Sequence, residues 1–250
     1  MSDDEPRTAD EMAELFDDKP RKRSEYAELL EEIRLLKNER EREKYVRGDE
    51  EAVRRIDEQL RPKLRRREEL HRLFRFRKTV PMRWVHDASP DDIRAAISAE
   101  QLIKVAQADD FHRRNALLLG PTKVGKSTAL ALMARRYILG GGDLVWCYSR
   151  TLGGAERRHP LGQDEPEEIT KAKAARVLVL DDLGQEEHRD QGTILDVIHA
   201  RYEAQLFTWT SSGLTYQQIG DRYGEHFARR LVECRGTAGR MVEAFPGRLH

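Results

Sequence analysis

Residues 116–128 have the sequence Ala-Leu-Leu-Leu-Gly-Pro-Thr-Lys-Val-Gly-Lys-Ser-Thr, and this stretch decides the fold. The apolar run 116–119 predicts a buried strand, and the Ala- and Leu-rich run 128–137 predicts a helix that packs on a sheet. Between them a glycine, four residues and Gly-Lys-Ser follow one another, which is the spacing of a phosphate-binding Walker A loop. Strand, loop and helix therefore stand in the order that a phosphate site requires.

Each part of this loop has a physical role. Gly120 and Gly125 allow a tight turn in which backbone N–H groups point at phosphate oxygens, and the helix N-terminus adds partial positive charge. Lys126 is expected to reach the β- and γ-phosphates, and the Ser127 hydroxyl to bind Mg²⁺. The alternative is a glycine-rich turn with an exposed lysine. The predicted cofactor-binding residues are Gly120, Pro121, Thr122, Lys123, Val124, Gly125, Lys126, Ser127 and Thr128.

A second motif lies about 55 residues downstream, where 177–184 have the sequence Val-Leu-Val-Leu-Asp-Asp-Leu-Gly. Four apolar residues followed by two acids are typical of a Walker B strand, buried on both faces as in parallel sheets. Such a strand places its carboxylates at the carboxyl edge of the sheet, where ligands bind. Asp181 is expected to hold Mg²⁺ through water, and Asp182 to polarise the attacking water. The alternative for an Asp-Asp pair is a helix cap or a turn.

Composition excludes several classes of protein. The 250 residues are 36% charged and 38% hydrophobic, and no apolar stretch approaches the roughly 20 residues that span a bilayer. The acidic N-terminus lacks the apolar core of a secretion signal. Cys147 and Cys234 lie far apart, as expected for reduced thiols and not for a metal site or a disulfide framework. We expect a cytoplasmic protein.

The zero net charge hides a polarised layout. Residues 1–20 hold eight acids and two bases, a net charge of −6, whereas 61–78 hold nine bases and two acids, a net charge of +7. We expect an acidic disordered tail over 1–23 and a charged helical arm, a hairpin or a coiled coil, over 24–78. Pro62 is expected to break or kink the arm's second helix. Segment 79–92 is expected to be a linker, followed by an ATP-binding domain over 93–250.

The basic stretch 61–78 leaves two interpretations open. Its bases could contact DNA phosphates while Leu70, Leu73, Phe74 and Phe76 stack on bases or pack on a partner. Alternatively, it is a solvated helix face whose apolar side chains join the core.

The rest of the chain predicts a three-layer α/β domain with a parallel sheet. Further strands are expected at 143–148, 206–210 and 240–245, and helices at 193–204 and 215–233. Residues 150–168 are polar and rich in glycine and proline, which predicts a surface loop. The polar residues after 206–210 would lie beside the Walker B strand, where a side chain could sense the γ-phosphate.

Together with His-Ala-Arg-Tyr-Glu (199–203) and Ala-Arg-Arg-Leu-Val-Glu (228–233), these motifs resemble AAA+ ATPases of the DnaC/IstB group, over 81–250 at most. These are bacterial helicase loaders and transposition helpers without a long C-terminal lid. The resemblance implies a homo-oligomer and a replicative helicase or transposase partner on DNA. It also makes Arg230 the arginine finger for a neighbouring subunit, with Arg222 and Arg229 as competitors and a salt-bridged surface arginine as the alternative.

One position departs from that group. Where its members carry Asn as sensor, this chain has Gly213, within Thr210-Ser211-Ser212-Gly213-Leu214. Thr210 or a serine could substitute, or hydrolysis could be slow. The expected function is therefore an ATPase that loads a helicase. The alternatives are an IstB-like transposition helper that binds target DNA and a nucleotide-gated scaffold with little hydrolysis. The absence of an Asn-Lys-x-Asp motif argues against a GTPase.

Overall fold

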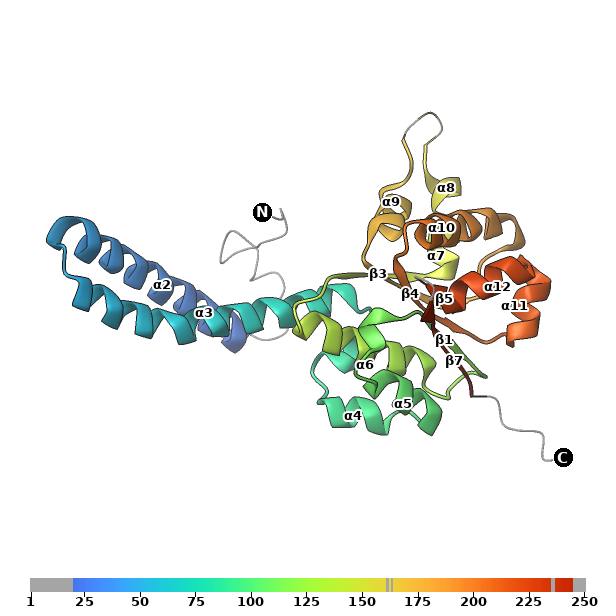
Figure 1. Cartoon of the computed structure of the whole chain (residues 1–250), viewed down its shortest axis with the longest axis horizontal. Helices are drawn as coiled ribbons and strands as arrows, with labels where there is room; N and C mark the ends of the chain where they lie inside the picture. The colour runs from blue at the N-terminus through green and yellow to red at the C-terminus, as the bar shows by residue number, and fades with distance from the viewer. Residues whose placement is uncertain (1–19, 161, 163, 235–236, 245–250) are drawn as a thin grey trace. The chain divides into compact units, whose positions relative to one another are not determined.

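The structure, a computed structural model, describes residues 20–160, 162, 164–234 and 237–244. The chain divides into two compact units, residues 1–75 and 76–250 (Figure 1). The first unit is a helical hairpin and the second is a three-layer α/β domain. The predicted fold class is thus confirmed.

The hairpin consists of α2 (Pro20–Arg42), a π-helical turn (Glu43–Arg47) and α3 (Glu50–Thr79). Gly48 ends the first helix in the left-handed conformation (φ 68°), and its N–H donates to the carbonyl of Glu43. The Asp49 side chain then accepts from the Ala52 N–H at 2.9 Å and starts α3. Apolar side chains join the two helices in two small cores: Tyr26 with Phe74, and Ile33 with Ile56 and Leu60.

Two expectations about the arm need correction. The first helix begins at Pro20 and not at Ser24, while residues 1–19, which hold most of the expected disordered tail, lie outside the described part of the chain. Pro62 does not break the second helix, because α3 runs without interruption from Glu50 to Thr79. Leu60 and Leu64 pack against α2 on either side of Pro62, and such tertiary packing outweighs the lost backbone hydrogen bond.

Segment 79–92 is not a linker. It contains a 3₁₀ helix (Arg83–His86) and the first turn of α4 (Pro90–Ala95), which Ser89 caps by accepting from the Asp92 N–H. Val80 and Val85 are fully buried in the core of the α/β domain, together with Phe76 from the end of α3. Proline content suggested a flexible connection, but these valines tie the segment to the domain.

Five parallel strands form the central sheet in the order β2-β3-β4-β1-β7. Their bounds are β1 Ala116–Leu119, β2 Leu144–Tyr148, β3 Val177–Leu183, β4 Phe207–Ser212 and β7 Arg240–Glu243. Alternate residues point to opposite faces, so that Leu118 and Val179 enter one core while Leu117 and Leu178 enter the other. Both faces are therefore covered, as parallel sheets require.

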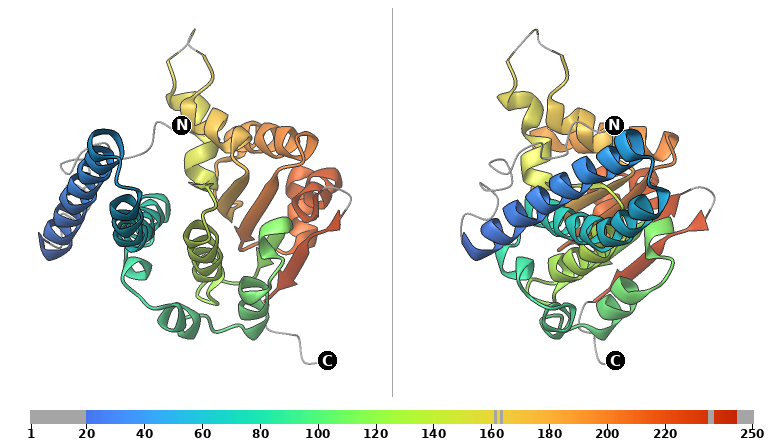
Figure 2. Two further views of the ribbon diagram at one scale, coloured as in Figure 1. Left: turned by 60° about the vertical axis from the view of Figure 1, so that its left-hand side comes forward. Right: turned by 90° about the vertical axis from the view of Figure 1, so that its left-hand side faces the viewer.

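Helices cover each face (Figure 2). One core contains residues of α4, α5 (Glu100–Gln107) and α6 (Lys126–Leu139). The other contains residues of α7 (Ser149–Gly153), α8 (Ala155–Arg158), α9 (Glu167–Ala174), α10 (Gln191–Glu203), α11 (Tyr216–Tyr223) and α12 (Glu225–Val232). Short 3₁₀ helices lie at Phe111–Arg113 and His188–Asp190, and β5 (Glu233–Cys234) pairs antiparallel with β6 (Thr237–Ala238).

Two further element predictions were wrong. Residues 150–168 are not one loop, because Leu152 is buried in α7 and Ile169 anchors the helix that begins at Glu167. The single helix expected over 215–233 is two helices, since Gly224 adopts φ 95°, a conformation outside the helical region. Within the described residues no helix follows α12, and none is long and apolar enough to cross a membrane.

Candidate nucleotide-binding site

The Walker A loop joins β1 to α6 and is packed tightly against its neighbours. Gly125 adopts φ 96°, and a Cβ atom there would lie 2.8 Å from the Cα of Ile97. Lys123, at the tip of the loop, also has a positive φ of 69°. The Ser98 hydroxyl donates to the Val124 carbonyl at 3.2 Å. Residues Ile97 and Ser98 therefore hold the loop from outside the motif, and no sequence signal indicated them.

Lys126 is the first residue of α6 and is largely buried. Its Nζ donates to the carbonyls of Gly120 at 2.9 Å and Pro121 at 2.8 Å, so the ammonium lies over the loop that it is expected to serve. Burial lowers the pKa of this lysine, while the charges of Asp182 and Asp181 act in the opposite direction. Phosphate oxygens would replace the two carbonyls as acceptors and stabilise the ammonium more strongly.

The two motifs meet at Asp181. The Ser127 hydroxyl donates to Asp181 Oδ1 at 2.9 Å, and the Ser211 hydroxyl from β4 donates to the same oxygen. The other carboxylate oxygen, Oδ2, is buried and has no hydrogen-bond partner in the described part of the chain. Burial raises the pKa of Asp181, and the charge of the neighbouring Asp182 raises it further. The hydrogen bonds from Ser211 and Ser127 lower this pKa but do not cancel the rise.

These residues fit a magnesium ion. Mg²⁺ is usually held by one or two carboxylates together with substrate phosphates and water. The described residues contain no cluster of three or more His, Cys, Asp or Glu side chains that would form a complete metal cage. Ser127 and the partnerless Oδ2 of Asp181 instead offer two oxygen ligands beside the phosphate loop. The remaining ligands would come from the nucleotide and water.

Asp182 lies in a strained turn at the end of the Walker B strand. Its φ is 57°, and the β3–β4 register shifts between Leu180 and Leu183, as at a β-bulge. Its N–H donates to the Ser211 hydroxyl at 3.0 Å, and its carbonyl accepts from the Ser149 hydroxyl at 2.5 Å. The backbone is thus fixed on both sides while the carboxylate stays exposed. An exposed carboxylate at this edge can reach a water molecule.

The end of β4 lies next to Asp181, as expected for a sensor position. Ser211 contacts Asp181, whereas the Ser212 hydroxyl donates to the Leu183 carbonyl at 2.6 Å. Thr210 Oγ1 is buried and has no partner among the described residues. Gly213 is exposed, and a Cβ atom there would meet nothing within 4 Å. Serine hydroxyls therefore occupy the place beside Asp181, and an asparagine would fit at position 213.

A buried carboxylate missed by the sequence analysis connects this edge to α11. Glu186 accepts from the Gly184 N–H at 3.1 Å, from Arg222 at 3.0 Å and from the Tyr223 hydroxyl. Burial raises the pKa of Tyr223 strongly, and the hydrogen bond to Glu186 adds to the rise. Arg222, one of the three arginines considered for the finger, is thus engaged within its own chain. The adjacent acids of Gln-Glu-Glu after the Walker B strand gave no signal of this role.

The structure does not bring Arg230 to the phosphate loop of its own chain. Arg230 lies in α12, and its backbone carbonyl accepts from the Asn115 side chain at 3.2 Å, immediately before β1 begins. The Walker A loop follows the other end of β1. The Arg230 guanidinium lies over the ring of Tyr202, with 5.4 Å between Cζ and the ring centre. Arg229 pairs loosely with Glu233 at 3.6 Å and is exposed.

Base stacking by the phenylalanines of the basic stretch is excluded. Phe74 is buried in the core of the hairpin, and Phe76 is fully buried in the α/β domain. Neither ring can reach a nucleic-acid base. Several bases of the stretch are ion-paired within the chain, among them Lys63 with Glu32 and Arg72 with Glu68. Contact of the exposed bases with DNA phosphates stays a prediction.

The three-layer parallel sheet and the loop between β1 and α6 define a P-loop nucleotide-binding fold. No family model and no curated protein sequence matches the chain. Among solved structures, it is similar to a DNA replication initiation factor (19% identity, TM-score 0.43, covering 58% of this chain and 42% of that one). It is also similar to the DnaC helicase loader, at 18% identity and a TM-score of 0.46, over 57% of this chain and 84% of that one. A third similar structure is DnaI, at 23% identity and a TM-score of 0.43, over 58% of this chain and 80% of that one.

Proposed function

We propose that this chain binds and hydrolyses ATP with Mg²⁺ and uses the turnover to load a replicative helicase on DNA, as a loader resembling DnaC. The observation that carries the ATP part is the hydrogen bond of Ser127 to Asp181, which joins the phosphate loop to the Walker B strand. The loader part rests on the sequence motifs shared with that group. A homo-oligomer is part of the proposal, because Arg230 lies away from its own phosphate loop.

The chain's own residues divide the work. Backbone N–H groups of 122–127 and the N-terminus of α6 would bind the phosphates, and Lys126 would place its ammonium on the β- and γ-phosphates. Ser127 and Asp181 would hold Mg²⁺, which neutralises phosphate charge when bound. Asp182 would orient and polarise the attacking water, and the finger from a neighbour would stabilise charge on the γ-phosphate. Residues 61–78 would add phosphate contacts to DNA.

Two alternatives share this nucleotide site. A transposition helper would use the same site and bind target DNA, and a neighbouring transposase gene in place of replication or phage genes would favour it. A nucleotide-gated scaffold is supported by the sensor position, where Gly213 carries no side chain and Ser212 is bonded to Leu183. In a scaffold, nucleotide binding changes partner affinity and hydrolysis contributes little.

Replacing Lys126 tests the ATP proposal. Lys126→Ala removes a charge-assisted donor worth about 1.5–3 kcal/mol, so we expect MgATP affinity measured by calorimetry to fall at least about tenfold. Lys104→Ala, which removes an exposed lysine of α5 paired with Glu100, is the matched control and should bind as the wild type does. Equal affinity in the two variants would reject the site.

The loader part needs a separate measurement. Size-exclusion chromatography of the chain with the hexameric replicative helicase of its organism should give a complex in MgATP that weakens with Lys126→Ala. Intact ATP hydrolysis without any such complex would leave the ATPase standing and reject the loader.

A further inference from the structure

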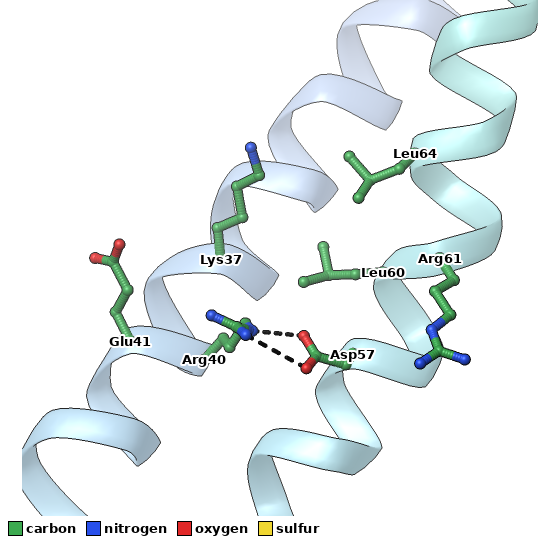
Figure 3. Close-up of a pocket in the computed structure, with 7 residues that line it drawn as sticks. All are labelled: Lys37, Arg40, Glu41, Asp57, Leu60, Arg61 and Leu64. Atoms are coloured by element: carbon green, nitrogen blue, oxygen red, sulfur yellow. Dashed lines mark hydrogen bonds and ion pairs between the residues drawn. The ribbon is translucent and has the colours of Figure 1, made fainter.

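The arm contains a groove between α2 and α3 that the proposed ATPase does not use (Figure 3). Its volume is about 470 Å³, and its lining residues are Lys37, Arg40, Glu41, Asp57, Leu60, Arg61 and Leu64. Leu60 and Leu64 point from α3 toward α2 and form an apolar floor. Arg40 crosses to Asp57 in a two-pronged ion pair, so those two charges are satisfied.

Unpaired cations surround this floor. Lys37 on α2 and Arg61 on α3 are exposed and have no hydrogen bond or ion pair in the described part of the chain. Arg54 and Arg65 extend the row on α3 by about three turns in all and are likewise exposed without a partner there. The same side of the hairpin also carries two exposed acids, Glu41 and Glu58, so the four cations outnumber the acids there. The groove therefore suits an acidic segment that also carries apolar side chains.

The chain supplies such a segment immediately before α2. Residues 10–18 have the sequence Asp-Glu-Met-Ala-Glu-Leu-Phe-Asp-Asp, with apolar side chains at positions 12, 15 and 16 among five acids. Three more acids precede it at Asp3, Asp4 and Glu5. Charge and apolar content are thus complementary to the groove.

The length of chain is sufficient. From Pro20 to Lys37 is 17 residues of helix, about 26 Å at about 1.5 Å per residue. Ten residues separate Asp10 from Pro20, and an extended chain of that length spans about 33 Å. Asp10 and Glu11 can therefore reach Lys37 and Arg61 of the same molecule. A short tether also gives an effective concentration in the millimolar range, so weak contacts suffice.

We propose that the acidic segment 1–19 docks in its own α2–α3 groove, with Asp10 and Glu11 on the Lys37–Arg61 side and Met12 on the floor of Leu60 and Leu64. The docked segment covers cations that would otherwise attract nucleic-acid phosphates, so a polyanion must displace it. Salt weakens the docking, because the ionic contacts lie at the surface. This proposal does not depend on ATP hydrolysis or on the identity of the partner.

A photocrosslinking residue in place of Met12, in the full-length chain, tests the proposal. We expect crosslinks within one chain to peptides that contain Lys37–Glu41 or Asp57–Leu64. Lys37→Glu with Arg61→Glu should lower the yield at least about fivefold. The matched control is Arg42→Glu with Arg55→Glu, which changes the same charge away from the groove, since Arg55 lies about 160° around α3 from Asp57. The control should retain the yield.

A charge swap separates loss of docking from loss of folding. Asp10→Lys with Glu11→Lys, added to the Lys37→Glu and Arg61→Glu variant, should restore the crosslink, which an unfolded arm could not do. Crosslinks elsewhere, or an equal yield in the groove and control variants, would overturn the proposal. Crosslinks that join two chains at the groove peptides would also overturn it and assign the groove to the segment of a second copy.

Discussion

At the scale of single residues, Asp181 combines two conflicting demands. Its carboxylate accepts from Ser127 and Ser211 through one oxygen, while the other oxygen is buried without a partner among the described residues. Burial raises its pKa above the value in the unfolded chain, so the folded protein binds the proton more strongly. Ionised Asp181 therefore lowers the stability of the nucleotide-free protein, and this cost disappears as the pH falls through the folded-state pKa.

Asp181→Asn removes that cost. Without Mg²⁺ and nucleotide near pH 7, we expect the variant to melt about 2–4 °C above the wild type, as about 1 kcal/mol would produce in a domain of this size. With MgATP the order should reverse, because a neutral amide holds Mg²⁺ poorly and the variant loses ligand stabilisation. Scanning calorimetry measures the two melting temperatures under both conditions. A lower melting temperature of the variant without ligand would contradict the burial argument.

Asp182, the adjacent acid, shows why two identical residues in one motif have different roles. Strand alternation buries Asp181, and the bulge at Asp182 turns its side chain outward at φ 57°. Aspartate tolerates this left-handed conformation better than most residues. The sequence predicted two carboxylates at one edge of the sheet, but the bulge that separates them depends on Ser149 and Ser211, which come from other strand ends.

At the scale of elements, the Glu186 contacts connect the Walker B strand to α11. Glu186 has a fully buried side chain and keeps Arg222 as its cationic partner. Arg222→Ala would leave this carboxylate with two donors, so we expect unfolding free energy to fall by about 1–3 kcal/mol in urea titration. Arg229→Ala removes an exposed arginine from the adjoining helix and should change the free energy of unfolding by less than about 0.5 kcal/mol. Equal effects would show that Glu186 does not need Arg222.

The sensor strand offers a test of the scaffold alternative. Gly213→Asn adds an amide at a position where a Cβ atom meets nothing within 4 Å, so folding should be unaffected. If a missing donor slows hydrolysis, the amide should raise phosphate release about tenfold or more, the scale of one well-placed donor to developing charge. Gly213→Ala adds a Cβ atom without a hydrogen-bond donor, so it should not raise the rate of phosphate release. Unchanged rates in both would show that the serines already suffice.

Element predictions succeeded where local signals and packing agree. The four apolar residues before Gly120 and before Asp181 predicted β1 and most of β3, because a strand buried on both faces needs that run. They failed where tertiary contacts decide. Pro62 is tolerated in α3 because Leu60 and Leu64 pack around it, and Val80 with Val85 turns an apparent linker into core. Glu186 and Ile97 carry no pattern of their own, because their partners lie elsewhere in the fold.

At the scale of the whole molecule, the position of Arg230 decides whether the site is complete in one chain. The residue lies at the Asn115 end of β1, with the Walker A loop at the other end. As the proposed finger, Arg230 would act on the site of another copy, as in a head-to-tail assembly. Arg230→Ala should therefore keep MgATP affinity and lose hydrolysis that depends on assembly. Its stability should change little, because the cation–π contact with Tyr202 contributes about 0.5–1 kcal/mol.

Mixing two inactive variants provides the sharper measurement. Lys126→Ala lacks a phosphate ligand but keeps its finger, and Arg230→Ala keeps its phosphate site but lacks the finger. In a random equimolar assembly, about a quarter of the head-to-tail interfaces join an intact site to an intact finger. We expect phosphate release to reappear on mixing and to vanish again on dilution. Lys126→Ala mixed with the double variant Lys126→Ala, Arg230→Ala must stay inactive, since no chain there has an intact site. If Arg230→Ala alone hydrolyses ATP as the wild type does, Arg230 is a surface arginine and the finger must be sought elsewhere.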